Sequence, residues 1–208
     1  MTVALPPAPE FGSPIDMTPV PEVLAFLATR RSTSAVTLVA PAPSADEVDV
    51  LLRLATRVPD HGKLAPWRFV ILEGEGKAAF AASLEALALS RSDQPAAAKL
   101  AKLKVPPLAV AVISAPRAAA IPEWEQRLSA GAVCTTMLYA ALAMGYGANW
   151  ITDWYAYDAE ANATLGLTGE EKVAGFLLLG TPREPPLERE RPAAEPLVSR
   201  WARDASAL

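Results

Sequence analysis

The chain has 208 residues, a net charge of −4 at pH 7 and a hydrophobic fraction of 51%. This length fits one domain, and this much apolar material can fill a core, so a wholly disordered chain is excluded. The acidic balance argues against a nucleic-acid-binding protein, which usually carries a basic excess.

The sequence contains one cysteine, Cys134. One cysteine cannot form a disulfide or a cysteine-based zinc site within a chain, which fits a reducing cytoplasm. The N-terminal stretch lacks the basic start of a secretory signal and is interrupted by prolines. We therefore expect a cytoplasmic protein in which Cys134 is a small, buried apolar residue.

The chain opens with a proline-rich segment, residues 1–17, which we interpret as a mobile arm. Thr18 is suited to cap a helix whose first residue is Pro19. This helix is expected to end near Arg30, and its apolar stripe consists of Val23, Leu24, Leu27 and Ala28.

A second helix is predicted by the capping-box spacing of Ser44 and Glu47, and Pro59 ends it. Farther along, apolar runs between turn residues indicate strands, and longer segments indicate helices. The strands are expected at 67–74, 106–114, 147–151 and 171–180, and the helices at 77–90, 95–105 and 122–144.

The segment between Arg127 and Asp153 has no charged residue and is long enough to cross a bilayer, which takes about 20 residues. It also contains three glycines and several hydroxyl groups, and it lacks a basic flank on its C-terminal side. We interpret it as a helix buried inside the protein and expect no contact with a membrane.

The mixture of long helices and short strands predicts an α+β domain over 18–182, with a small mixed sheet packed by long helices. The remainder, 183–208, is rich in proline and charge. We interpret it as an extended C-terminal tail that packs on a partner subunit.

The segment GEGKAA, residues 74–79, matches the dinucleotide fingerprint G-x-G-x-x-G/A after a strand. The fingerprint also needs a second strand with an acidic residue about 20 residues on. Here the following segment is polar and helical. A plain strand-to-helix turn is therefore favoured over a nicotinamide site.

Arg30, Arg31 and Ser32 form a compact set of donors at a helix end. Arginine grips phosphate through paired hydrogen bonds, so the set suits a phosphate group. Cations at the C-terminal end of a helix also complement its dipole, and this motif alone does not separate the two interpretations.

His61, the only histidine, follows Arg57 within RVPDH. A metal site would need further ligands, and a serine triad would need a nucleophile motif that is missing. A ligand contact and a surface turn without a role both remain open for His61.

Two further segments combine aromatic and polar residues. PEWEQ, residues 122–126, places acidic residues at a helix start, where capping explains them. In GANWITDW, Thr152 and Asp153 lie between Trp150 and Trp154 at a strand end. These aromatic side chains either line the pocket of a flat ligand or belong to the core.

The order of these motifs resembles the nitroreductase family, above all its short, minimal subgroup of NAD(P)H nitroreductases. The motifs are RRS, RVPDHGKLAPWRF, PEWEQRLSAG, GYGANW and GFLLLGTP, and the resemblance spans roughly residues 20–200. It implies the nitroreductase fold, FMN held without a covalent bond, and a homodimer whose flavin sites draw on both subunits.

Carried over by residue, the resemblance implies that Arg30, Arg31 and Ser32 hold the phosphate and ribityl side of FMN from one subunit. Arg57 and His61 reach the flavin from the other subunit. The flavin edge follows Trp150 and then Ile151, Thr152 and Asp153, although Asp153 stands where the family usually has a small residue. Arg189 and Arg191 in the tail are candidates for further phosphate contacts.

The implied activity is that of an FMN-dependent oxidoreductase. NAD(P)H would reduce the flavin and leave, and a nitroaromatic, a quinone or a similar small acceptor would then be reduced in a ping-pong cycle. The alternative is a non-catalytic, flavin-binding or flavin-storing dimer, which has the same sequence features.

Overall fold

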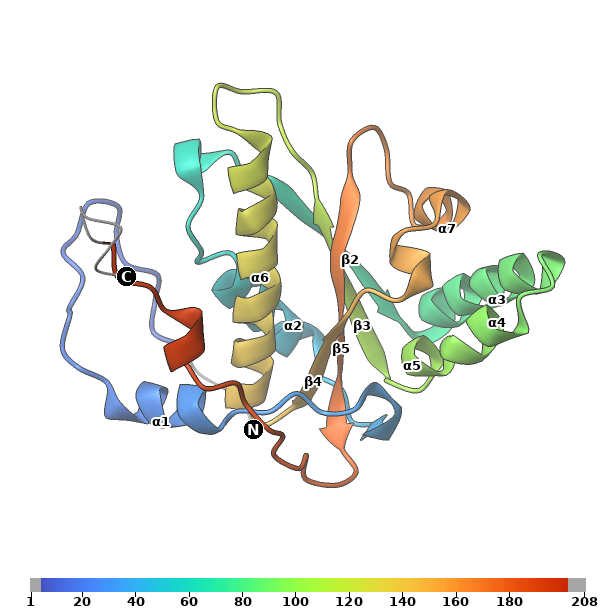
Figure 1. Ribbon diagram of the computed structural model, residues 1–208, viewed down its shortest axis with the longest axis horizontal. Helices are drawn as coiled ribbons and strands as arrows, with labels where there is room; N and C mark the ends of the chain where they lie inside the picture. Colours follow the sequence, from blue (N-terminus) through green and yellow to red (C-terminus); the bar gives the residue numbers. More distant parts are fainter. Residues whose placement is uncertain (1–4, 202–208) are drawn as a thin grey trace.

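A computed structural model describes residues 5–201 of the chain. The helices are α1 (Pro21–Thr29), α2 (Ala45–Ala55), α3 (Gly74–Ser90), α4 (Gln94–Lys99), α5 (Ala101–Lys104), α6 (Glu123–Ala143) and α7 (Ala159–Thr164). The strands are β1 (Leu38–Val39), β2 (Trp67–Glu73), β3 (Leu108–Ser114), β4 (Gly147–Ile151) and β5 (Lys172–Pro182). Figure 1 shows the sheet between α2 and α6 on one side and α3, α4, α5 and α7 on the other.

All strand pairs in the sheet are antiparallel. The order is β1-β5-β3-β2, and β4 also pairs with β5. The α+β class is confirmed, but the prediction of a mixed sheet is wrong. Parallel strands need a crossover connection that returns the chain to the end of the sheet where the first strand began.

The connection between β2 and β3 explains the difference. After β2, α3 runs away from the sheet, and α4 and α5 return beside it. The ammonium of Lys77, near the start of α3, therefore donates a hydrogen bond to the carbonyl of Lys104, at the end of α5, over 2.9 Å. The chain arrives where β2 ended, so Leu108 pairs with Glu73 and β3 runs antiparallel.

The alternating side chains of β3 contribute to two hydrophobic clusters, one on each face of the sheet. Leu108, Val110 and Val112 pack with buried residues of α2 and α6. Ala109, Ala111 and Ile113 face the cluster formed with α3, α5 and α7. Because both faces are covered, all seven residues of β3 are buried.

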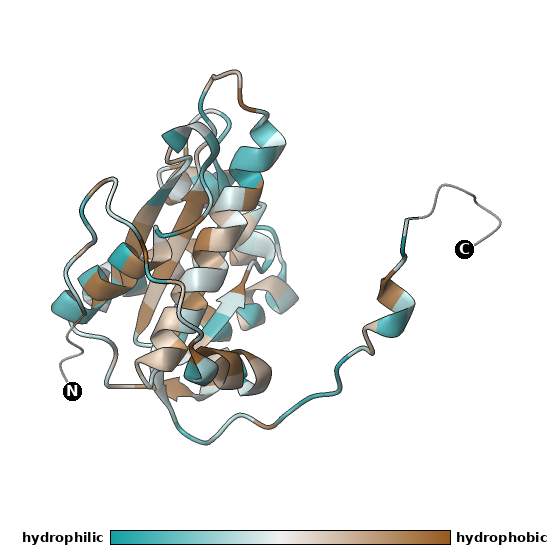
Figure 2. Ribbon diagram, turned by 90° about the vertical axis from the view of Figure 1, so that its left-hand side faces the viewer, coloured by the Kyte–Doolittle hydropathy of each residue, from teal (hydrophilic) through white to brown (hydrophobic). Residues whose placement is uncertain are grey.

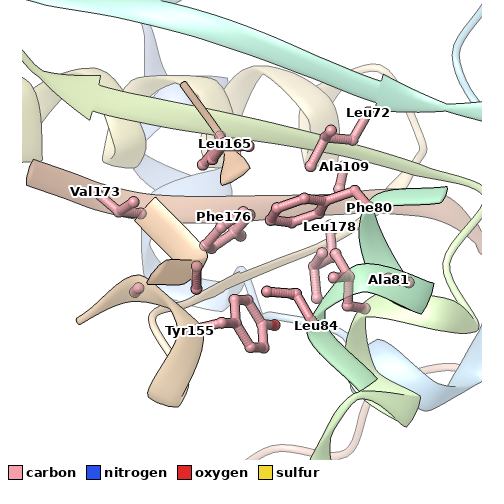
Figure 3. Packing of buried hydrophobic residues seen from close by; sticks show 14 of the residues in the cluster. Leu72, Phe80, Ala81, Leu84, Ala109, Tyr155, Leu165, Val173, Phe176 and Leu178 are labelled. Atoms are coloured by element: carbon pink, nitrogen blue, oxygen red, sulfur yellow. The ribbon is translucent and has the colours of Figure 1, made fainter. Parts of the chain in front are cut away.

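Aromatic packing organises the second cluster, which Figure 3 shows from close by. The rings of Tyr155 and Phe176 meet edge to face with their centroids 5.0 Å apart, and Phe80 lies 6.5 Å from Phe176. Each such ring removes a large apolar area from water. Tyr155 comes from the short 3-10 helix Trp154–Ala156, which anchors the end of β4 to this face.

Several boundaries differ from the sequence predictions. The capping box of Ser44 and Glu47 is present. The first helix starts at Pro21 rather than Pro19, because the carboxylate of Asp16 engages the backbone N–H and the hydroxyl of Thr18. The short elements β1 and α7 carry too few residues for a recognisable period and were not predicted.

The uncharged segment forms most of α6 and all of β4, and it is only partly buried. One side of α6 packs on the sheet, and Cys134 is buried there as expected. The opposite side, which includes Leu128, Ala132 and Tyr139, stays partly or fully accessible. Within the described part of the chain, no helix is long and apolar enough to cross a membrane.

Both terminal segments lie largely outside the packed body. The arm from residue 5 contacts it where Arg53 donates to the carbonyl of Pro6 and the ammonium of Lys63 lies over the ring of Phe11. The tail leaves after β5 and extends away from the body (Figure 2). Residues 1–4 of the predicted arm and 202–208 of the predicted tail lie outside the described residues.

Candidate functional site

The RRS segment follows directly on α1 and turns its first arginine toward α6. The guanidinium of Arg30 lies 5.6 Å from the ring centre of Tyr139 and donates to the hydroxyl of Ser32 over 3.1 Å. Its Nε is buried and has no hydrogen-bond partner among the described residues. A buried donor without a partner costs about 1–3 kcal/mol, so this atom is suited to an acceptor from outside the chain.

A hollow of about 490 Å³ lies beside this segment, lined by residues 31–34, Thr37 and the start of the tail, residues 184–187. The Nε of Arg31 donates to the carbonyl of Leu187 over 2.8 Å, which ties the tail to the hollow. Farther along the tail, Arg191 forms an ion pair with Glu188 at 3.1 Å. The guanidinium of Arg189 turns to the carbonyl of Glu190.

The RRS segment and β4 lie side by side. The backbone N–H of Thr33 donates to the carbonyl of Ala148 over 2.9 Å, and the amide of Asn149 donates back to the carbonyl of Thr33. This exchange joins the predicted phosphate residues to the strand that carries Trp150. The structure therefore brings together two of the three predicted parts of the site within one chain.

The side chains after Asn149 mostly have partners inside the protein. Trp150 lies over Gly175 of β5, where any side chain would collide with it, and its indole N–H donates to the carbonyl of Ala174. Ile151 packs against the cluster around Phe176. The hydroxyl of Thr152 accepts a hydrogen bond from Tyr157 over 2.8 Å.

The carboxylate of Asp153 has partners inside the protein. The side chain is only 7% exposed, accepts the backbone N–H of Trp154 over 2.8 Å and forms an ion pair with Lys102 at 3.1 Å. This explains why an acid is tolerated at a position where a small residue is expected. The backbone carbonyl of Asp153 accepts the N–H of Ala156 over 3.0 Å, so its backbone N–H is the polar group left to meet a ligand.

His61 opens a short 3-10 helix, His61–Lys63, after the turn that ends α2. The turn is closed by the carboxylate of Asp60, which accepts the backbone N–H groups of Leu64 and Ala65. The Nδ1 of His61 lies 2.8 Å from the Oε2 of Glu125 in the first turn of α6. In the sequence, helix capping explains Glu125, and the 64 residues between it and His61 leave no local signal for this contact.

Arg57 lies near His61 at the end of α2 and lines a hollow of about 480 Å³ together with residues 5–9 of the arm. His61 contacts α6 at Glu125, near the start of the helix, and Arg30 of the RRS segment contacts it at Tyr139, near the end. At 1.5 Å per residue, the two contact points are about 21 Å apart along the helix. One chain therefore does not gather the two predicted residue sets at one point.

Comparison with known proteins identifies the family. A model of the Nitroreductase family matches residues 27–181. The chain is 34% identical over 165 residues to "Putative NAD(P)H nitroreductase YdjA" of Escherichia coli K12, which covers 78% of this chain and 89% of that protein. A "Putative NAD(P)H nitroreductase" of Haemophilus influenzae is 31% identical over 169 residues, 78% of this chain and 90% of that protein.

Solved structures share the fold at lower sequence identity. The nitroreductase-like family protein of Bacillus cereus aligns with a TM-score of 0.75 at 20% identity, covering 89% of this chain and 99% of that one. A nitroreductase of Bacteroides fragilis, solved with bound FMN, aligns with a TM-score of 0.66 at 20% identity, covering 87% and 99%. The fold and the extent of the sequence match agree, and the chain belongs to the nitroreductase family of oxidoreductases.

Proposed function

We propose that the protein is an FMN-dependent oxidoreductase that uses NAD(P)H to reduce nitroaromatic, quinone or similar small acceptors in a ping-pong cycle. The observation that carries the proposal is the buried, unpartnered Nε of Arg30 beside Ser32, in a chain of this family. The names of relatives at 31–34% identity support the reductant, and the FMN held by the Bacteroides fragilis protein supports the cofactor.

The residues around Arg30 fit the phosphate of FMN. A phosphate supplies several charged acceptor oxygens, and Arg30, Arg31 and Ser32 supply donors of the matching kind. The buried Nε of Arg30 would gain the partner that it lacks in the isolated chain. The hollow of about 490 Å³ next to Arg31 leaves space on this side of the segment.

The active form in this proposal is a homodimer with FMN between the subunits. Among residues 5–201, nothing buries the apolar stripe of α1: Leu24 is 67% exposed and no residue of the helix is buried. Contiguous exposed apolar surface is typical of an interface. A second copy would cover it and would bring Arg57 and His61 of the partner subunit toward the site at RRS and β4.

FMN, when bound, supplies the redox chemistry by taking up a hydride from NAD(P)H and passing electrons to the acceptor. The chain supplies binding and electrostatics. Arg30, Arg31 and Ser32 would anchor the phosphate, and the permanent cation of Arg57 would favour negative charge on a ring placed against it. The ring would be bordered by Trp150, Ile151, Thr152 and Asp153. Contacts with β5, Tyr157 and Lys102 fix the side chains of Trp150, Thr152 and Asp153, respectively.

A dinucleotide site at GEGKAA has less support. Helix α3 starts at Gly74, directly after β2, so no loop is present to surround a pyrophosphate. The ammonium of Lys77 is buried against the carbonyl of Lys104. We therefore place the nicotinamide reductant at the flavin rather than at this turn.

The visible absorbance spectrum of the purified protein tests the cofactor. We expect a yellow protein that releases FMN into the supernatant on heat denaturation. A colourless protein that also fails to take up added FMN would refute the proposal. Steady-state oxidation of NADH and NADPH with a quinone or nitroaromatic acceptor then separates an enzyme from a flavin-storing dimer, which would show no turnover.

A further inference from the structure

The single imidazole of the chain is held by a carboxylate from another element. The Nδ1 of His61 lies 2.8 Å from Oε2 of Glu125, while the side chain is 63% exposed. The other ring nitrogen, Nε2, has no hydrogen-bond partner within residues 5–201. The ring is therefore fixed on one edge and open on the other.

Both partners of this contact stand on ordered elements. The carbonyl of Pro59, two residues before His61, accepts the hydroxyl of Ser129 on α6 over 2.6 Å. Ser129 lies one helical turn after Glu125, so the turn and the helix are joined beside the contact. Gly62 lies close to Ile121, in the loop before α6, where an added Cβ would meet the Ile121 side chain at 3.1 Å.

The other charged groups of the turn have different partners. The carboxylate of Asp60 accepts two backbone N–H groups, and the ammonium of Lys63 lies over the ring of Phe11. Glu125 is thus the charged group that engages the His61 ring in the described part of the chain. An exposed contact between polar side chains contributes little to stability, so orientation of the ring is its more substantial effect.

A carboxylate only accepts hydrogen bonds, so the ring nitrogen facing Glu125 must carry a proton. We propose that Glu125 is a positioning residue that fixes neutral His61 in its Nδ1-protonated form and presents Nε2 outward as an acceptor. In the proposed function, on which this second part rests, Nε2 would face the flavin of the partner subunit. A neutral His61 would then complement an N–H group of the flavin ring, and Arg57 would be the donor to its oxygens.

The presence of only one histidine makes the test direct. We would label the full-length protein with ¹⁵N-histidine, remove any flavin, and record the imidazole nitrogens at a pH about two units above 6.5, where an ordinary histidine is neutral. We expect Nδ1 to carry the proton in the wild type and in Glu125→Gln, whose amide oxygen still accepts. Glu125→Ala should return the ring to a mixture in which Nε2 carries most of the proton.

Glu123→Ala is the matched control. Glu123 also lies in the first turn of α6 and pairs with Arg127 rather than with His61. Its removal changes the helix terminus to the same extent and should leave the tautomer unchanged. Protonation of Nε2 in the wild type, or an equal response to both alanine variants, would overturn the proposal.

Titration of the flavin-free protein with FMN distinguishes the two parts of the proposal, which are the positioning of His61 by Glu125 and the contact of His61 with the flavin. We expect Glu125→Ala to weaken FMN binding about tenfold, which corresponds to about 1.4 kcal/mol, and Glu125→Gln to retain most of the affinity. If the tautomer changes as expected but His61→Ala and Glu125→Ala both bind FMN normally, the positioning stands and the flavin contact is refuted. A wild type that takes up no FMN refutes the proposed function without affecting the tautomer result.

Discussion

Arg30 combines a buried guanidinium nitrogen that lacks a partner with contacts to Ser32 and Tyr139. The sequence left two interpretations open, phosphate binding and complementation of the helix dipole. In the structure, the side chain turns to α6 rather than to the last carbonyls of α1. This orientation favours the phosphate interpretation.

We predict that Arg30→Ala weakens FMN binding by one to two orders of magnitude, because a charged hydrogen bond to phosphate contributes about 1.5–3 kcal/mol. Riboflavin, which has no phosphate, should bind the variant and the wild type equally well. Titration of flavin-free protein with both ligands measures this. Arg91→Ala, which removes an arginine paired with Asp158 and Glu160, is the control. Equal losses for FMN and riboflavin would contradict a phosphate contact.

The ionised carboxylate of Glu171 makes the stability of the fold depend on pH. Its hydrogen bonds from Arg68, at 2.6 and 2.8 Å, lower the pKa of this carboxyl from 4.5 to about 2. A carboxyl whose pKa is lower in the folded state stabilises the protein above the unfolded pKa, and this contribution is lost as the pH falls from about 4.5 to about 2.

We therefore predict that Glu171→Gln lowers the free energy of unfolding at pH 7 by about 1–2 kcal/mol, a value reduced for the partial exposure of Arg68. The difference from the wild type should shrink steadily below pH 4.5. Urea denaturation between pH 7 and pH 3 measures it. The control is Glu170→Gln, because Glu170 forms no ion pair among the described residues. A difference that stays constant with pH would contradict the role of the ion pair.

At the scale of elements, β4 packs against β5 through a close contact between Trp150 of β4 and Gly175 of β5. A Cβ on Gly175 would lie 1.9 Å from the Nε1 of Trp150, so the indole occupies the space that a side chain would need. In the sequence, Trp150 fits either the wall of a ligand pocket or the core. The contact with β5 shows how the strand holds the ring in place.

We predict that Gly175→Ala destabilises the protein by about 1–3 kcal/mol, because the indole must move or the strands must separate. Thermal unfolding followed by tryptophan fluorescence measures the change. Gly76→Ala is the matched control, since Gly76 lies in α3 with open space around its Cβ position. Its replacement should be neutral or stabilising by up to about 1 kcal/mol. If Gly175→Ala leaves thermal unfolding unchanged, the Trp150 ring has room to move.

At the scale of the whole molecule, the apolar surface that one chain leaves uncovered runs along α1 and the outer side of α6. Both helices meet where the rings of Phe26 and Tyr139 lie 6.0 Å apart. The proposed dimer covers this surface, and it also accounts for the distance between the RRS segment and His61. We therefore expect that a change that prevents dimerisation also weakens flavin binding.

We predict that Leu24→Asp yields a monomer that binds FMN at least tenfold more weakly, because a charge in an apolar interface must be desolvated without a partner. Light scattering and flavin titration measure the two effects on the same sample. Leu89→Asp on α3 is the control, since Leu89 is exposed but lies on the other side of the sheet. A Leu24→Asp monomer with normal flavin content would contradict a site shared between subunits.

Local patterns determined most of the elements. The capping box at Ser44, the apolar runs of β2, β3 and β5 and the long helix α6 were all predictable, because their signals repeat within a few residues. The order of the motifs was sufficient to identify the family. The assignments of Arg30 to phosphate and of Arg57 and His61 to a partner's flavin remain predictions from that resemblance.

Other features depended on contacts between distant residues. The antiparallel sheet follows from the return of α4 and α5 beside α3, which no single strand encodes. The engagement of Asp153 by Lys102 and of His61 by Glu125 joins residues 51 and 64 positions apart. By itself, the sequence determined the longer helices and strands and the family to which the chain belongs, because their signals repeat within a few residues or lie in short motifs. Only the tertiary structure decided which charged groups are paired inside the fold and which, such as the Nε of Arg30, are buried without a partner among the described residues, because burial and partners exist only after the elements have packed.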